Sequence, residues 1–106
     1  MTAVGAIEAR PPSIAVEAQS LVFTALSDAT RRAIVERLAA NGPMTVGRLS
    51  EPFDVSAPAI SRHLRVLEMA GLVTRSVDRQ WRICTLELDN LKTAQAWLDR
   101  VVQAGS

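Results

Sequence analysis

A mainly α fold that includes one two-stranded β-hairpin is the fold class that the sequence predicts. Apolar residues recur at helical spacing from about residue 14 to residue 71. β-Branched and aromatic residues then gather on both sides of a short polar connection between residues 72 and 88. Helical spacing returns from Asp89 onward. These three observations predict four helices, a hairpin and a fifth helix, in that order.

Length and composition limit the chain to one domain. It has 106 residues, of which 48% are hydrophobic, which is enough for one modest core and too few for two. No apolar run approaches the ~20 residues that cross a bilayer, and the N-terminus lacks the pattern of an export signal. Cys84 is the single cysteine, so an internal disulfide is impossible. We therefore expect a soluble, cytoplasmic protein.

The N-terminal part predicts a leader followed by a first helix. Residues 1–13 are rich in small residues and have no sustained period, so we expect a disordered leader there. The domain itself is expected to span residues 14–106. Its first helix is predicted at about residues 14–26, where apolar residues recur at helical spacing. These apolar positions are Ile14, Ala18, Leu21, Val22 and Ala25.

The next two helices are both bounded by residues that start or stop a helix. A second helix is predicted at residues 29–40 and ends at Asn41-Gly42-Pro43. Thr45 can cap a short third helix at residues 46–50. Residues 52–55 begin with a proline and form a turn, because proline disfavours helical backbone in the residue before it. A short helix, a tight turn and a longer helix together indicate a helix-turn-helix.

The fourth helix has two chemically different faces. Ser56 is a suitable N-cap, and Gly71 can adopt the left-handed backbone that ends a helix. At helical pitch Ile60, Leu64 and Leu67 share one side and predict a buried stripe. Hydroxyls and guanidiniums on the other side are groups that bind phosphates and guanine edges. The outer residues are Pro58, Ser61, Arg62, Arg65 and Met69.

The strand-like region predicts a hairpin with a basic tip. Residues 72–77 and 81–88 are the two strands, and residues 78–80 are a polar three-residue connection that includes Arg79. An isolated hairpin is only marginally stable, so this one is expected to pack on the helices. The final helix starts at Asp89 and has an apolar stripe. This stripe consists of Leu91, Ala94, Leu98, Val101 and Val102, with Trp97 at its edge.

The distribution of charge points to the fourth helix and the hairpin. The whole chain has a net charge of only +1, whereas residues 56–82 contain five arginines and two carboxylates. A localised positive patch is the electrostatic feature expected of a nucleic-acid-binding protein. The alternative for the fourth helix alone is an ordinary amphipathic surface helix.

Three motifs stand out along the chain, which are Leu26-Ser-Asp-Ala-Thr-Arg-Arg-Ala-Ile-Val35, Pro43-Met-Thr-Val-Gly-Arg-Leu49 and Val55-Ser-Ala-Pro-Ala-Ile-Ser-Arg-His-Leu-Arg-Val-Leu-Glu-Met-Ala-Gly-Leu-Val73. They resemble the motifs of one family, the ArsR (ArsR/SmtB) transcriptional repressors. The resemblance extends from about Leu21 to Val102, and the motifs occur in the family's order. It is closest to the subgroup without the metal-binding box, and it implies a winged helix-turn-helix fold.

The resemblance also implies partners and site residues. It implies a homodimer joined through the first and last helices, and double-stranded DNA at a promoter operator as the ligand. The dimerisation residues would be Leu21, Val22, Leu91, Ala94, Leu98 and Val101. The DNA-binding residues would be Ser56, Pro58, Ser61, Arg62, His63 and Arg65 on the helix, with Arg75, Arg79, Gln80 and Arg82 on the wing.

One position departs from the family pattern. Family members often have a polar side chain near Ala57, whereas a methyl group cannot form a hydrogen bond with a base. Contacts with thymine methyl groups and the shape of the DNA therefore become more important sources of specificity. Arg31 and Arg32 lie at the start of the second helix, and two roles are open for them. They pair with nearby carboxylates, or they contact DNA.

Metal binding, cofactors and catalysis find no support in the sequence. The metal sensors of the family use cysteines near Val46-Gly-Arg48 and histidines in the last helix, and neither is present here. One histidine and one cysteine are too few for a typical zinc site. No glycine-rich phosphate loop and no paired nucleophile and base occur, so we expect no enzyme activity.

The sequence therefore predicts a DNA-binding transcriptional repressor that acts as a homodimer on an inverted-repeat operator. One alternative adds a sensor, in which a small molecule or oxidation of Cys84 releases the protein from DNA. A second alternative is a winged-helix dimerisation module that does not bind DNA, and it rests on the small net charge.

Overall fold

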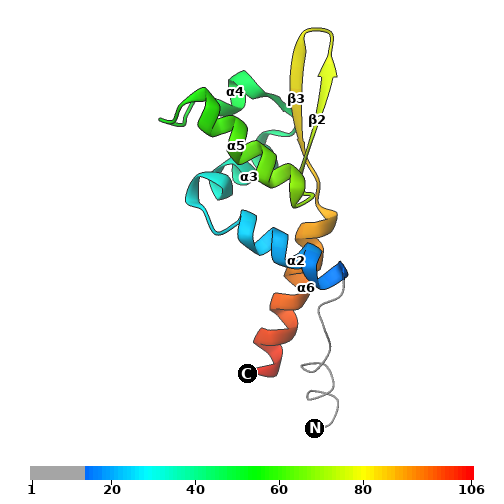
Figure 1. Cartoon of the computed structure of the whole chain (residues 1–106). Helices are drawn as coiled ribbons and strands as arrows, with labels where there is room; N and C mark the ends of the chain where they lie inside the picture. The colour runs from blue at the N-terminus through cyan, green and yellow to red at the C-terminus, as the bar shows by residue number, and fades with distance from the viewer. Residues whose placement is uncertain (1–13) are drawn as a thin grey trace.

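The structure, a computed structural model, describes residues 14–106 and has the predicted order of helices around a small sheet (Figure 1). The leader expected at residues 1–13 lies outside the described residues. Within residues 14–106, no helix is both long enough and apolar enough to span a bilayer. The elements are α2 (Ile14–Ala25), α3 (Ala29–Asn41), β1 (Met44–Thr45), α4 (Val46–Ser50), α5 (Ala57–Met69), β2 (Val73–Asp78), β3 (Trp81–Leu86) and α6 (Asp89–Ala104).

Both ends of α3 are capped, and its C-terminal end confirms the predicted stop. Asp28 is its N-cap and accepts a hydrogen bond from the backbone N–H of Arg31 at 3.0 Å. At the other end Gly42 has a φ of 77°, and its N–H donates to the carbonyl of Leu38. A positive φ costs glycine little conformational energy because glycine has no Cβ. This explains why the helix stops at Gly42.

The sheet has three strands, one more than the two that the sequence predicts. β1 consists of two residues, and Met44 and Thr45 pair antiparallel with Cys84 and Ile83 of β3. The strand order is β1-β3-β2. A two-residue strand is too short to show a period, and Thr45 also serves as the N-cap of α4. The side-chain oxygen of Thr45 accepts a hydrogen bond from the N–H of Arg48, as the capping prediction requires.

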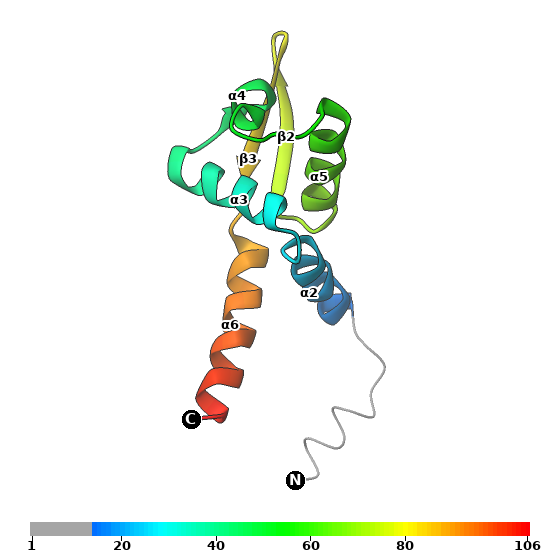
Figure 2. The same cartoon turned by 90° about the vertical axis from the view of Figure 1, so that its left-hand side faces the viewer.

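The hairpin connection has two residues instead of the three expected. Asp78 belongs to β2 and pairs with Trp81, which leaves Arg79 and Gln80 as the turn. Arg79 has a φ of 59°, the positive value that tight hairpin turns require. Figures 1 and 2 show that this hairpin, the wing, projects beyond the helices at the end opposite the C-terminus.

The core lies where the base of the wing meets the helices. In Figure 2 the strands run between α3 and α4 on one side and α5 on the other. The predicted stripe of α5 is buried, with Ile60 exposed by 3% and Leu64 and Leu67 by 0%. Burying a leucine side chain contributes roughly 1.5–3 kcal/mol, so this stripe fixes α5 against the core. The largest side chains that are fully buried are Ile34, Leu38, Leu49, Leu64, Leu67, Leu72, Val22, Val73 and Cys84.

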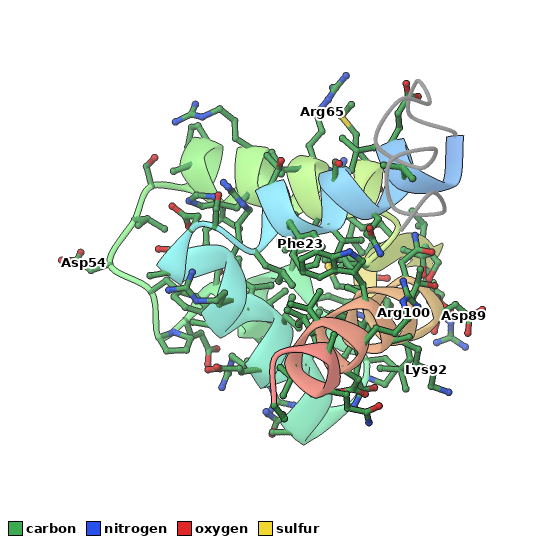
Figure 3. All side chains as sticks on the ribbon, turned by 90° about the horizontal axis from the view of Figure 1, so that it is seen from below. Phe23, Asp54, Arg65, Asp89, Lys92 and Arg100 are labelled. Atoms are coloured by element: carbon green, nitrogen blue, oxygen red, sulfur yellow. The ribbon has the colours of Figure 1, made fainter. Side chains whose placement is uncertain are left out.

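α2 and α6 pack together at the opposite end of the molecule from the wing (Figure 1). Phe23 of α2 and Trp97 of α6 form an edge-to-face pair with ring centroids 5.5 Å apart, and Figure 3 shows Phe23 between the two helices. Leu98 and Val101 remain half exposed, at 47% and 50%.

Two residues expected at the dimer surface lie elsewhere. Val22 is exposed by 1% and Ala94 by 4%, because both fill the core of the protomer itself. Both pack in the core of the protomer, and Ala94 also lines a groove beside α6. Leu21, which is exposed by 46%, does lie on the surface as expected.

Candidate DNA-binding interface

The helix α5 is bounded by the residues that the sequence indicated. The Ser56 side-chain oxygen accepts a hydrogen bond from the N–H of Ala59 at 3.2 Å. Pro58 lies in the first turn, where its missing N–H leaves no helical hydrogen bond unmade. Gly71 follows the helix with a φ of 71°. These features give α5 a defined start and end, and so a defined orientation of its faces.

The outer face of α5 offers unpaired cations. Arg62 and Arg65 are both exposed, and neither guanidinium makes a hydrogen bond or ion pair with any residue of 14–106. Figure 3 shows Arg65 pointing away from the rest of the molecule. Pro58, Ser61 and Met69 are exposed on the same helix. A long arginine without an internal partner can extend to phosphates or to guanine.

His63 lies between this outer face and the protein interior. Its Nδ1 is 3.3 Å from Nη1 of Arg31 in α3 and 3.9 Å from Oδ2 of Asp28. The histidine side chain is 20% exposed. The same Asp28 carboxylate caps α3, and its pKa is lowered mainly by the hydrogen bond from the Arg31 backbone N–H. His63 therefore joins α5 to the start of α3.

The four wing residues predicted to bind DNA are all exposed, and one of them is paired with a carboxylate. Arg79 and Gln80 form the exposed tip, and Arg82 is exposed on β3. Arg75 is instead engaged by Glu68 of α5, which lies 2.7 Å from its Nε and 2.5 Å from its Nη2. Arg75 thus links the wing to α5, and the Glu68 carboxylate offsets its charge.

Strand alternation determines which way Arg82 faces. Arg82 pairs with Val77, and two positions further along the hairpin Cys84 pairs with Arg75. Residues two apart share one face of a strand, so Arg82 lies on the same face as the buried Cys84. This is the face toward the helices, and Arg82 therefore lies on the same side of the wing as α5.

Cys84 is inaccessible in this structure. It is 0% exposed, and burial raises the pKa of its thiol, while the nearby Arg75 charge acts in the opposite direction. A buried thiol with a raised pKa has little thiolate, which is the reactive form. Among residues 14–106 no three or more His, Cys, Asp or Glu side chains are grouped so that they could hold a metal ion.

Two contributors to this surface were not identified from the sequence. Glu68 engages Arg75 across the turn, and opposite charges seven residues apart gave a weak signal for it. Arg31 contacts His63 from 32 positions away. Pairing with a nearby carboxylate and contact with DNA were the two alternatives for Arg31, and no local pattern could have indicated its contact with an imidazole.

A helix-turn-helix whose second helix displays unpaired arginines, followed by a hairpin with a basic tip, defines a winged helix-turn-helix DNA-binding protein. Residues 26–76 match the family model described as "Helix-turn-helix domain". The chain is 47% identical over 78 residues to the HTH-type transcriptional regulator Rv2034 of Mycobacterium tuberculosis, covering 74% of this chain and 72% of that protein.

Further comparisons identify the family. The chain is 34% identical over 84 residues to the transcriptional repressor SdpR of Bacillus subtilis, covering 79% of this chain and 92% of SdpR. The crystal structure of the ArsR family transcriptional regulator RHA00566 superposes with a TM-score of 0.76 at 34% identity, covering 83% of this chain and 90% of that one. The chain belongs to the ArsR family and is a DNA-binding transcriptional regulator.

Proposed function

We propose that the protein is a homodimeric repressor that binds an inverted-repeat operator in the cytoplasm and blocks the promoter it occupies, including its own. The observation that supports this most directly is the outer face of α5, where Arg62 and Arg65 are exposed without partners in residues 14–106. Repression, rather than activation, is favoured by the similarity to SdpR, which is named a transcriptional repressor.

The residues of α5 divide between base contacts and phosphate contacts. Arg62 and Arg65 can form paired hydrogen bonds with guanine or bind phosphate, and Ser61 can bind either. Ser56 uses one lone pair of its oxygen as the cap acceptor, so its hydroxyl hydrogen and a second lone pair remain for DNA. Pro58 and the neighbouring Ala57 offer apolar surface, which fits thymine methyl groups. A helix with so few polar groups at its start obtains part of its specificity from the shape of the DNA.

The wing adds contacts beside the helix. Arg79 and Gln80 at the tip are suited to phosphate or the minor groove. Arg82 faces the same side as α5 and is suited to phosphate. Arg75 contributes by holding the wing to α5 through Glu68. The position of the wing relative to the helix is therefore part of the binding surface.

An apolar surface on α2 and α6 supports the homodimer. Leu21, Leu98 and Val101 are roughly half exposed there. Leu98 also lines a groove of about 520 Å³ between the two helices. The groove is lined by Phe23, Leu26, Leu88, Leu91, Lys92, Ala94, Gln95, Leu98 and Asp99. Exposed apolar surface of this kind marks an interaction site, and a two-fold partner would cover it.

Sensing through Cys84 is not part of the proposal. Oxidant sensors depend on an accessible thiolate, whereas Cys84 is buried and its pKa is raised. The dimerisation module without DNA binding is set aside because the chain belongs to a family of DNA-binding regulators.

Selection from a random duplex library, followed by footprinting on the protein's own promoter, tests the proposal. We expect an enriched inverted repeat whose half-sites are one helical turn apart, about 34–36 Å. We also expect binding to weaken with salt, with a slope of about −0.9 for each phosphate contacted. Enrichment of a single unrepeated half-site would refute the dimeric mode, and a flat salt dependence would refute phosphate contact by the arginines.

A further inference from the structure

The guanidinium of Arg31 joins three helices at one point. Its Nε donates to the carbonyl of Ala25 at 2.7 Å, and its Nη2 donates to the carbonyl of Thr24 at 3.2 Å. These carbonyls lie at the C-terminal end of α2, where the helix dipole favours a cation. Its remaining nitrogen, Nη1, lies 3.3 Å from Nδ1 of His63 on α5. Two hydrogen bonds to α2 therefore hold Arg31 in place against the histidine.

A hydrogen bond from Nη1 of Arg31 to Nδ1 of His63 requires one particular tautomer of the imidazole ring. Arginine has only hydrogen-bond donors and keeps its charge in proteins. The Nδ1 atom of His63 can accept from Nη1 only if Nδ1 carries no proton. The ring proton must then lie on Nε2, and the ring is neutral. Protonation of Nδ1 would place two donors and two positive charges against each other.

The opposing influence comes from Asp28. Its Oδ2 lies 3.9 Å from Nδ1 of His63, and the same oxygen accepts the backbone N–H of Arg31. This carboxylate and the Arg31 guanidinium are the charged groups of residues 14–106 that contact the ring. If Arg31 were absent, Asp28 would be the remaining partner and would favour a proton on Nδ1.

The Nε2 atom is left for a ligand outside the protomer. It makes no hydrogen bond with a residue of 14–106. Arg37 Nε is the one buried side-chain nitrogen or oxygen in that range without a partner, so Nε2 of His63 is accessible to solvent. His63 directly follows Arg62 on the helix whose outer face is assigned to DNA. A DNA phosphate beside α5 is the acceptor that this position would meet.

We propose that Arg31 is a positioning residue, which holds His63 as the neutral tautomer with its proton on Nε2, so that Nε2–H donates to a DNA phosphate. The proposal rests on the proposed DNA-binding face and adds to it a residue that does not itself touch DNA. It also connects α2, one of the two helices with the apolar surface, to a DNA contact on α5.

The tautomer can be observed in the free protein. His63 is the only histidine of the chain, so a long-range ¹H–¹⁵N spectrum has a single set of ring signals. At neutral pH we expect the wild type to show a protonated Nε2 and an unprotonated Nδ1. In Arg31→Met the Nδ1–H tautomer should increase. A wild-type ring protonated on Nδ1 would overturn the proposal, and this measurement requires neither a variant nor DNA.

The effect on DNA is tested with a double-mutant cycle on the duplex selected by the wild type. His63→Ala and Arg31→Met should each weaken binding about tenfold, equivalent to about 1.4 kcal/mol, and the double variant should be no weaker than either. His63→Gln should retain most of the affinity because its amide N–H extends about as far as Nε2, whereas the shorter His63→Asn should not.

Arg32 provides the matched control. It is the next residue of α3, and its Nη1 donates to the Leu26 carbonyl at 2.8 Å without contacting His63. Arg32→Met should leave the ring signals unchanged, and any effect on affinity should add to that of His63→Ala. Additive losses for Arg31→Met and His63→Ala, with circular dichroism confirming the fold, would overturn the proposal. Failure of the wild type to bind any duplex would instead refute the proposed function and leave the tautomer result standing.

Discussion

Arg62 and Arg65 are the residues on which DNA binding should depend most. Both are exposed on α5 and have no partner in residues 14–106, so their removal should cost the fold little. We predict that Arg62→Ala and Arg65→Ala each reduce operator affinity by about 1–3 kcal/mol while the protein stays folded. Fluorescence anisotropy with the selected duplex measures the loss, and the thermal midpoint checks the fold.

Arg100 is a matched control for these two substitutions. It is an exposed arginine on α6, which Figure 1 places away from the wing and the outer face of α5. Arg100→Ala removes the same charge, so it should reproduce only the long-range electrostatic part of the loss. If Arg100→Ala weakened binding as much as Arg65→Ala, the assignment of α5 as the contacting helix would be wrong.

The charge of Asp28 should make stability depend on pH. Its pKa is lowered mainly by the hydrogen bond from the Arg31 backbone N–H, and the Arg31 charge adds to this. A lowered pKa in the folded state stabilises the protein above the ordinary pKa, and the contribution is lost as pH falls through the lowered value. Asp28→Asn keeps a capping oxygen but has no charge. The wild type should therefore have a higher thermal midpoint than Asp28→Asn at neutral pH. If this difference in midpoint persisted in strong acid, the Asp28 charge would not be its cause.

At the level of elements, the junction between α5 and α6 links the DNA-binding helix to the apolar end. The Asn90 side-chain amide at the start of α6 donates to the Ala70 carbonyl at the end of α5, at 3.0 Å. The Glu87 N–H donates to the Leu72 carbonyl at 2.9 Å. Between them Gly71 has a positive φ, and a Cβ there would overlap the Asn90 side chain. These contacts tie the start of α6 to the end of α5.

We predict that Gly71→Ala destabilises the protein more than Asn90→Ala does. The left-handed backbone alone costs alanine about 1–2 kcal/mol, and displacing the Asn90 amide adds the loss of a hydrogen bond, roughly 0.5–1.5 kcal/mol. Asn90→Ala loses only the hydrogen bond. Urea unfolding of each variant gives the free energies of unfolding.

Gly47 provides the control glycine. It lies in α4, and a Cβ there would meet nothing within 4 Å. Because alanine favours helices more than glycine, Gly47→Ala should be neutral or stabilise by up to about 1 kcal/mol. Equal destabilisation by Gly47→Ala and Gly71→Ala would show that the junction is not a special position.

The elements that the sequence predicted well are those with strong local signals. Ser56 and Gly71 bound α5, and a stripe at helical spacing identifies its buried side, so one helix sufficed to indicate the outer residues. Contacts between distant segments had no such signal. The strand β1 depends on pairing with β3, and the role of Arg31 depends on where α2 and α5 meet. Such contacts form only when distant segments pack together, so the spacing of apolar residues along the sequence could not predict them.

At the level of the whole molecule, Figure 1 shows the wing at one end and α6 at the other. The wing and α5 present the unpaired arginines, whereas α2 and α6 present the half-exposed apolar residues. A net charge of +1 therefore conceals a polarised molecule. With the apolar ends joined about a two-fold axis, two copies of α5 could face one DNA duplex, and each protomer would need the other to bind tightly.

Leu98 tests this dependence, because it is exposed by 47% and lines the apolar groove. We predict that Leu98→Asp yields a folded monomer, since a carboxylate in an apolar interface is costly to bury. Val55→Asp is the control, because Val55 is 40% exposed in the turn before α5. Sedimentation analysis should show wild type and Val55→Asp as dimers. Affinity of Leu98→Asp for the full operator should fall on the order of 10²-fold, since the gain from two linked sites is lost. Persistence of the dimer in Leu98→Asp would place the interface elsewhere.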